Sequence, residues 1–276
     1  MQTARFLHVC ERAARAGGQV LLDLLGQVHP REKGPRDLVT EADIRSQEVI
    51  REIVLGEFPD HLFLGEEESA DPLADLSASE REQALCWVVD PLDGTTNFVH
   101  RLPSFAVSIA LEQNNDLLAG VVFDPVANEC YAAAKGRGAS LNGQRLEVSQ
   151  CRQLRQALVA TGFSPDVQRG SLEIEQFVEM LTECQGLRRL GSAALNCCYL
   201  AAGRLDGYWA TSVKKWDVAA GVLILLEAGG QIQQIDKGPF QLNRPQFVAA
   251  ATPELSQEMF DVLGRACCSD GAGSRT

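Results

Sequence analysis

The chain has 276 residues, of which 45% are hydrophobic and 22% are charged, an ordinary composition for a globular protein with a large core. Its formal net charge of −12 argues against a nucleic-acid-binding surface, because phosphate backbones are bound by clustered Lys and Arg. An acidic protein that acts on an anionic substrate needs a cation between the two.

The N-terminus and the cysteines bear on localisation. Charged side chains such as Arg5, Glu11 and Asp23 interrupt the first 25 residues, so this segment predicts neither a secretion signal nor a membrane span. The nine cysteines are scattered and form no CxxC pair, which argues against a zinc site or a disulfide framework and favours small buried thiols. We therefore expect a cytoplasmic protein with no membrane partner.

Helical patterns dominate the beginning of the chain. Apolar residues recur at helical spacing from Thr3 to Leu25 and predict an amphipathic helix. A polar segment through Pro30 and Gly34-Pro35 is typical of a loop. Thr40 is then expected to cap a second helix. The expected inner face of that helix carries Ile44, Ile50 and Val54.

Strand patterns follow an expected exposed loop over residues 70–79. An apolar run at 85–89 is expected to end at Asp90-Pro91, because proline cannot donate to a ladder. Two further runs flank the turn signal Asn114-Asn115-Asp116 and predict a hairpin. The expected strands are 105–112, 117–123 and 130–134.

The second half of the chain alternates between strands and helices. The expected strands are 157–161, 207–210, 231–235 and 247–250, and the expected helices are 172–184, 192–202, 217–228 and one after Pro253. The change of pattern predicts two halves, residues 1–150 and 151–268, with a cleft between them that holds the active site. The small, polar tail over 269–276 is expected to be disordered.

The segment Asp90-Pro-Leu-Asp-Gly-Thr-Thr-Asn97 carries the densest chemical signal. Carboxylates as close as Asp90 and Asp93 repel each other unless they are protonated or bridged by cations, and Mg²⁺ selects such oxygen ligands. The carbonyl of Leu92 can add another oxygen. Gly94 and Thr95 offer a tight backbone, exposed amides for a phosphate, and a hydroxyl that can hold an attacking water. An Asp-Gly pair alone is usually only a turn.

Three further acidic segments have both a structural and a functional interpretation. The run Gly65-Glu66-Glu67-Glu68-Ser69 is either a solvated acidic loop or a source of a metal ligand. Asp43 either completes a capping box with Thr40 or presents a carboxylate beside the metal site. Asp217 is expected at the N-cap of a helix, where it either caps the helix or closes the metal site.

Another helix start, Gly191-Ser192-Ala193, offers backbone donors to an anionic substrate. Other phosphate and hydrolase motifs are missing from the chain, which contains no GxxxxGK[ST], GxSxG or HExxH sequence. The histidines His8, His29 and His61 are interpreted as structural or solvent-facing, whereas His100 is left without an assignment.

These residues resemble the signatures of the inositol monophosphatase family. The first signature corresponds to Asp90–Phe98, and the second to Trp216–Gly221 followed by Glu227-Ala-Gly-Gly230. The segments 37–43 and 65–67 are similar to two further family motifs, in the same order and at the same spacing. The resemblance extends from the first helix to about residue 265.

The resemblance implies a layered αβαβα sandwich of the α+β or α/β class, usually a homodimer, that uses two or three Mg²⁺ ions and is often inhibited by Li⁺. The implied metal ligands are Glu66, Asp90, the Leu92 carbonyl, Asp93 and Asp217. Asp43, Glu66 and Thr95 are implied as the catalytic residues that position and activate a water. The implied substrate contacts are Asp93, Gly94, Thr95, Gly191, Ser192, Ala193 and Asp217.

One position departs from the family pattern. Inositol-binding members usually carry a Glu seven residues before the Asp of the second signature, and this chain has Ala210 there. The missing carboxylate puts myo-inositol specificity in doubt and leaves the metal site complete. The extra Glu in 66–68 also leaves Glu67 as an alternative to Glu66.

The expected function is therefore Mg²⁺-dependent hydrolysis of a small phosphorylated polyol or sugar, with inositol 1-phosphate as the first candidate. Alternative substrates are fructose 1,6-bisphosphate, histidinol phosphate and a nucleotide 3′-phosphate. A non-catalytic protein on the same fold is the alternative from another functional class.

Overall fold

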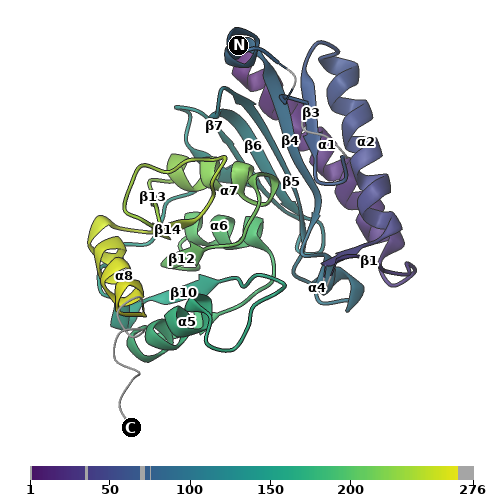
Figure 1. The fold of residues 1–276 in the computed structure, drawn as a ribbon. Helices are drawn as coiled ribbons and strands as arrows, with labels where there is room; N and C mark the ends of the chain where they lie inside the picture. The colour runs from purple at the N-terminus through teal and green to yellow at the C-terminus, as the bar shows by residue number, and fades with distance from the viewer. Residues whose placement is uncertain (1, 35–36, 69–71, 75, 267–276) are drawn as a thin grey trace.

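The computed structural model describes residues 2–34, 37–68, 72–74 and 76–266, and it stacks helices and sheets in alternating layers (Figure 1). Two long helices, α1 (Gln2–Leu24) and α2 (Glu41–Glu57), pack on one face of a seven-stranded sheet. A middle helical layer separates that sheet from a five-stranded sheet, and two more helices form the opposite surface. The αβαβα sandwich predicted from the sequence is confirmed.

The seven-stranded sheet is buried between two helical layers. Its strands in spatial order are β3 (Leu62–Gly65), β4 (Leu85–Asp93), β5 (Ala106–Gln113), β6 (Asp116–Asp124), β7 (Glu129–Ala134), β8 (Ala139–Leu141) and β9 (Gln144–Arg145). Alternate residues serve the two faces, as the period of a strand requires. Val89 packs into the cluster shared with α1 and α2, whereas Val88 packs into the cluster shared with the middle helices. The predicted hairpin of β5 and β6 is confirmed.

The middle layer consists of α6 (Ala193–Ala201) and α7 (Lys215–Glu227), which contact both sheets. Helix α7 is buried on nearly all sides, which matches its almost uninterrupted run of apolar residues. At its end, the Glu227 carboxylate accepts hydrogen bonds from the N–H groups of Gly136, Arg137 and Gly138 at 2.6–3.0 Å. These bonds fasten the far end of α7 to the β7–β8 turn of the seven-stranded sheet.

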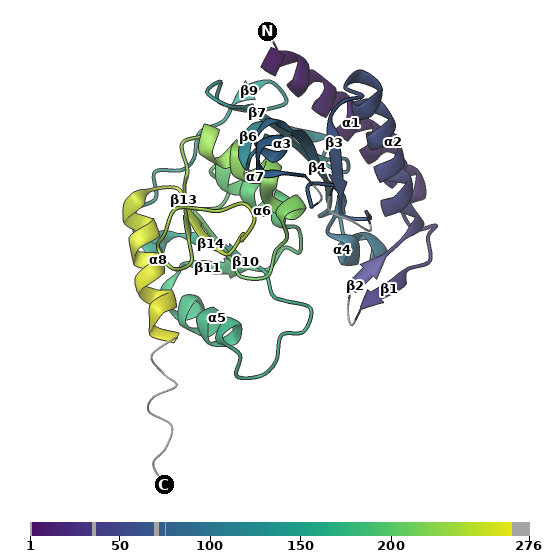
Figure 2. The same ribbon diagram turned by 45° about the horizontal axis from the view of Figure 1, so that its top comes forward.

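The five-stranded sheet and its outer helices complete the molecule, and Figure 2 shows them beyond the middle layer. The strands in spatial order are β11 (Gly186–Arg188), β10 (Leu158–Thr161), β12 (Gly207–Ala210), β14 (Phe247–Ala250) and β13 (Gln231–Gln234). Helices α5 (Leu172–Glu183) and α8 (Pro253–Ala266) cover the outer face, with the short 3₁₀ helix η1 (Leu154–Gln156) beside them. The predicted division near residue 150 falls between the last strand of one sheet and the first strand of the other, and we propose it as the boundary between two halves.

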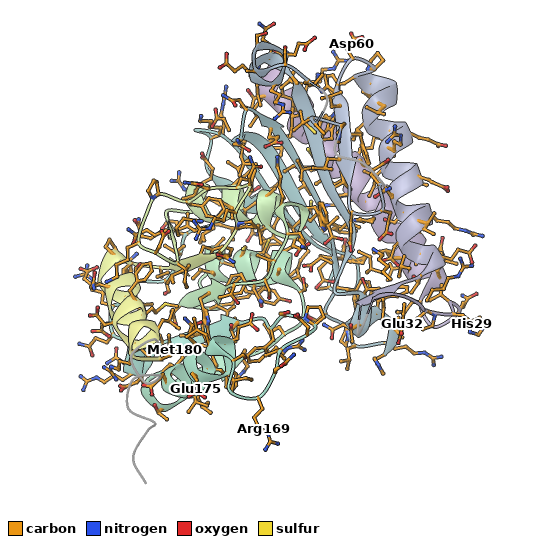
Figure 3. The ribbon with its side chains drawn as sticks, viewed as in Figure 1. His29, Glu32, Asp60, Arg169, Glu175 and Met180 are labelled. Carbon is orange, nitrogen blue, oxygen red and sulfur yellow. The ribbon has the colours of Figure 1, made fainter. Side chains whose placement is uncertain are left out.

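Two segments predicted as loops contain regular structure. The polar segment after α1 forms a hairpin of β1 (Arg31–Gly34) and β2 (Asp37–Val39). Because its residues are polar and largely exposed, β1 has no alternation of apolar residues from which a strand could be predicted. Figure 3 shows Glu32 and the nearby His29 pointing outward. In the predicted loop 70–79, residues 78 and 79 begin helix α3 (Ala78–Gln83), for which Ser77 and Glu80 form a capping box. The rest of that segment lies only partly within the described residues.

Smaller differences concern single side chains. Ile44 was expected on the inner face of α2 and is 43% exposed, whereas Ile50 and Val54 are fully buried as predicted. Cys10, Cys86, Cys130, Cys197 and Cys198 are buried, which confirms their prediction as small core residues. The tail over 269–276 lies outside the described residues. Among the residues described, no helix combines the length and apolar character that crossing a bilayer needs.

Candidate active site

The segment at the end of β4 differs from its prediction. The strand does not end at Asp90-Pro91 but continues to Asp93, with an irregularity in its pairing to β5 between Asp90 and Asp93. Pro91 is tolerated at this irregularity because a bulged residue needs no ladder hydrogen bond. Asp90 and Asp93 are 2% and 8% exposed. The strand therefore delivers two carboxylates into the interior of the molecule.

Gly94 and Thr95 turn the chain from β4 into the short helix α4 (Thr95–Val99). Gly94 has a φ of +97°, and a Cβ atom there would lie 2.9 Å from the carbonyl oxygen of Ser104, so glycine is required at this position. The turn places Thr95 Oγ1 3.1 Å from the Leu92 carbonyl oxygen and 3.3 Å from Asp43 Oδ1. The Thr95 hydroxyl thus connects the first predicted motif to the start of α2.

Asp43 fulfils the structural interpretation of its motif and also lies in the site. Its Oδ2 atom accepts hydrogen bonds from Thr40 N at 2.8 Å and Thr40 Oγ1 at 2.7 Å, which confirms the capping box. Its other oxygen faces Thr95. Burial raises the pKa of Asp43 to about 6 despite these hydrogen bonds, and the negative charge of Glu67 adds to the rise. Asp43 is consequently a stronger base than an exposed aspartate.

Glu66 and Glu67 follow β3 and share a lysine from the β1–β2 hairpin. Lys33 Nζ lies 3.1 Å from Glu66 Oε1 and also contacts Glu67 Oε1. Glu67 is held in place through its backbone N–H, which donates to Gln47 Oε1 at 3.1 Å. Burial raises the pKa of Glu66 to about 7, although the ammonium of Lys33 opposes the rise. The negative charge of Glu66 contributes to the raised pKa values of Asp90 and Asp217, so Glu66 lies near both. This proximity favours Glu66 over Glu67 as the candidate metal ligand.

Asp217 enters from the opposite half of the chain, and its predicted position in the helix is corrected. Helix α7 begins at Lys215, so Asp217 is the third helical residue and Lys214 is the N-cap. The Lys214 N–H donates to Asp217 Oδ2 at 2.7 Å, which is half of a capping box. Lysine is rarely an N-cap, and this concealed the true helix start. The carboxylate still points into the site, where it lines the same pocket as Asp93.

The start of α6 contacts Asp93. Ser192 caps this helix, and its hydroxyl donates to Asp93 Oδ2. The N–H groups of Ala193 and Ala194 donate to the two Asp93 oxygens at 3.2 and 2.7 Å. Of the residues expected to contact a substrate, Ala193 thus directs its N–H at Asp93, while Gly191, Ser192 and Ala193 all line the inner pocket described below. The donors at the start of α6 place the negative charge of Asp93 at the positive end of the helix.

Gly191 precedes this helix with a φ of +87° and packs against the amide of Asn97. Asn97 Nδ2 donates to the carbonyl oxygens of Ser104 and Leu190 at 2.7 and 2.8 Å. The asparagine at the end of the first motif thereby joins α4 to the loop before α6.

The gathered carboxylates carry strong mutual repulsion. Burial raises the pKa of Asp93 to about 6. Burial, followed by the negative charges of Glu66, Asp93 and Asp217, holds the pKa of Asp90 well above its usual range. Burial and the charge of Asp93 do the same for Asp217. These directions show an excess of negative charge that a bound cation would relieve.

The donor set fits Mg²⁺ in chemistry, since it consists of carboxylate and carbonyl oxygens. Within the described residues, no three His, Cys, Asp or Glu side chains already encircle one point as ligands of an ion do. Each carboxylate is instead engaged by protein donors, such as Lys33 for Glu66 and the Leu92 N–H for Asp90 at 2.9 Å. For Glu66 to hold a metal ion, its contact with Lys33 would have to be given up.

Two adjoining pockets lie beside these carboxylates. The inner pocket, of about 210 Å³, contains Asp93, Asp217, Asn196 and Ala210 in its lining. The outer pocket, of about 570 Å³, is lined in part by Gly94 and Thr95. Both pockets share Phe163, Pro165, Arg189 and Gly191. A cleft was expected between the two halves of the chain, and the inner pocket is lined by carboxylates from both halves, Asp93 of β4 and Asp217 of α7.

Several residues of this region carried no sequence signal that we interpreted. Lys33 lies in a polar segment without a motif, and Arg189 lies in the loop before α6. Asn196 is 2% exposed inside α6 and would pass for a helix residue. Of the histidines, His100 is exposed at the end of α4 and lies outside both pocket linings. His61 packs on Phe58 and Trp87, as a structural histidine does.

Comparison with known proteins gives matches along nearly the whole chain. Residues 3–265 match the model of the inositol monophosphatase family. The chain is 39% identical over 270 residues to an inositol-1-monophosphatase from Rhizobium meliloti, covering 96% of this chain and 98% of the relative. It is 38% identical over 268 residues to a Nus factor SuhB from Pasteurella multocida, covering 96% and 97%.

The solved structures include a close match to the same architecture. The extragenic suppressor protein suhB from Bartonella henselae superposes with a TM-score of 0.86 at 34% identity, over 94% of this chain and 98% of that chain.

Proposed function

The chain belongs to the inositol monophosphatase family, and on that premise we propose that it is a Mg²⁺-dependent phosphomonoesterase. The observation that carries the proposal is that Asp93 and Asp217, from the two halves of the chain, line one pocket. Glu66 and Asp90 lie near enough to interact with them electrostatically, and Thr95 contacts the buried Asp43. The proposed metal ligands are those predicted from the sequence, including the Leu92 carbonyl. The proposed reaction is hydrolysis of a small phosphorylated polyol or sugar.

The metal ions, when bound, would supply positive charge that neutralises the transferring phosphoryl group and the leaving oxygen. The chain's own residues would position the attacking water. Thr95 Oγ1, 3.3 Å from Asp43 Oδ1, can accept a hydrogen bond from a water while it donates its own proton toward Asp43. Asp43 keeps this orientation because its other oxygen is fixed by Thr40.

A Thr95→Val variant is expected to lower kcat by about 100-fold, since general acid–base assistance contributes 10²–10⁴ in rate. Valine has nearly the same shape as threonine but no hydroxyl, so Mg²⁺ affinity measured by calorimetry should change little. Thr95→Ser is the matched control, because it keeps the hydroxyl and should retain activity within about tenfold. Equal losses in both variants would contradict a role for the hydroxyl.

The substrate is proposed in two steps. Inositol 1-phosphate is the reference candidate, because a relative of similar length and 39% identity is named an inositol-1-monophosphatase. Ala210 favours a second candidate class, an ester other than inositol phosphate, because a methyl group lines the inner pocket where inositol-binding members carry a carboxylate. Fructose 1,6-bisphosphate, histidinol phosphate and a nucleotide 3′-phosphate belong to this class.

The test is phosphate release from these four esters with and without Mg²⁺. We expect Mg²⁺-dependent release from at least one of them. Several relatives are named Nus factor SuhB, a name that states no phosphatase activity. If calorimetry detects Mg²⁺ binding but no ester releases phosphate, the non-catalytic alternative replaces the proposed function. The predictions of a homodimer, of Li⁺ inhibition, of a cytoplasmic location and of no nucleic-acid partner remain proposals.

A further inference from the structure

The two pockets share a cationic side chain that the metal chemistry does not use. Arg189 lies between the end of β11 and the N-cap of α6 and lines both pockets. Its side chain is exposed, and within the described part of the chain it forms no ion pair with a carboxylate. Other arginines of this region are directed elsewhere. Arg188 donates to the Leu187 carbonyl oxygen at 3.0 Å, and Arg169 points away from the molecule (Figure 3).

The carboxylates that line the inner pocket already have a proposed role as metal ligands. Asp93 and Asp217 are its acidic lining residues within the described chain, and both belong to the proposed metal site. Position 210, at the end of β12, presents only a methyl group to the same space. With metal ions bound to Asp93 and Asp217, no unneutralised carboxylate among the described lining residues would repel an anion. Such an anion could therefore bind the guanidinium of Arg189.

The inner pocket also contains an unused hydrogen-bond acceptor. Asn196 is 2% exposed, and its Oδ1 atom has no hydrogen-bond partner among the described residues. An unpaired buried acceptor costs free energy unless a ligand or water supplies a donor. A hydroxyl group of a sugar or polyol supplies such a donor. The pocket thus combines a place for a hydroxylated body with a guanidinium at the junction to the outer pocket.

We infer that Arg189 selects substrates that carry a second anionic group, phosphate or carboxylate, in addition to the ester that is hydrolysed. The inference rests on the proposed phosphatase function and specifies its substrate class. A guanidinium binds phosphate and carboxylate through two parallel hydrogen bonds, which makes it suited to this recognition. With alanine at position 210, the pocket favours an ester that carries a second anionic group over the phosphate ester of an uncharged polyol.

The experiment compares fructose 1,6-bisphosphate with fructose 1-phosphate, which share the ester at carbon 1 and differ in the phosphate at carbon 6. In the wild type, kcat/KM for the bisphosphate should exceed that for the monophosphate by about tenfold, the effect of one charge-assisted contact. Arg189→Gln should reduce this ratio to about one, chiefly by raising KM for the bisphosphate. Arg189→Lys should keep part of the preference.

Two further variants sharpen the comparison. Arg188→Gln removes the neighbouring charge outside both pockets and should leave the ratio unchanged. Ala210→Glu should lower the ratio, because its carboxylate would repel the second anion. In the wild type, the ratio of the two kcat/KM values should also fall as NaCl is added, since salt screens the contact between Arg189 and the second anion. This measurement uses the wild-type protein alone, so it does not depend on the folding of a variant.

The outcomes separate the two proposals. A wild-type ratio near one, or an Arg189→Gln variant that slows both esters equally, overturns the inference while phosphate release continues to support the phosphatase. Absence of phosphate release from fructose 1-phosphate and from all four esters of the proposed function overturns the proposed function itself.

Discussion

An Asp93→Asn variant is expected to retain at most about a thousandth of the wild-type Mg²⁺-dependent phosphate release, a loss of about 4 kcal/mol of transition-state stabilisation. Asp93 is the residue on which two parts of the site depend. It belongs to the proposed metal ligands, and it also accepts hydrogen bonds from Ser192, Ala193 and Ala194. Asparagine keeps one acceptor oxygen for the donors of α6, loses the other, and carries no charge for a metal ion.

The measurement is phosphate release at saturating substrate and a range of Mg²⁺ concentrations. Asp116→Asn is the matched control, because Asp116 lies in the same sheet and pairs with Lys135 at the surface. It should keep wild-type turnover. Turnover close to that of the wild type in the Asp93 variant would refute the proposed site.

The second large effect concerns stability in the absence of metal. The pKa values of Asp43 and Asp93 are raised to about 6 and that of Glu66 to about 7, so the folded chain holds these protons more tightly than the unfolded chain does. Stability from a carboxyl group with a raised pKa is present below its unfolded pKa and is lost as pH rises through its folded pKa. The metal-free site should therefore weaken the fold increasingly between about pH 4 and pH 7.

Mg²⁺ should reverse this loss, because it binds the ionised carboxylates and competes with protons. At 100 times its Kd, a ligand contributes about 2.7 kcal/mol, which raises Tm by about 5–10 °C for a chain of this size. Thermal melts with Mg²⁺, or with NaCl of equal ionic strength as the control, should show this rise at about pH 8 and less than half of it at about pH 5. Equal shifts at both pH values would contradict the linkage.

Local rules were sufficient for much of the site. The capping box of Thr40 and Asp43 follows from residue type and spacing, and the structure has it. The buried β4 strand was evident from its apolar residues, and Gly94 was recognised as the residue of a tight turn. These features depend on interactions within a few residues, which a sequence pattern records directly.

Other features depend on contacts between distant segments. The N–H of Ala193 was expected to face a substrate, yet it donates to Asp93 about a hundred residues earlier in the chain. Lys33 reaches Glu66 from a hairpin whose polar strands show no apolar alternation. Charge alone predicts that such groups attract, but only the packing of the layers determines which groups meet.

The order of protein synthesis gives helix α7 a further consequence. Glu66, Asp90, Leu92 and Asp93 precede residue 94, whereas Asp217 leaves the ribosome much later, at the start of a helix whose far end is tied to the seven-stranded sheet by Glu227. N-terminal segments fold first during translation. A nascent chain that lacks α7 would leave much of one face of that sheet uncovered and would lack one of the proposed ligands. Under the proposed function, catalytic competence would therefore arise together with the burial of that face, when α7 docks.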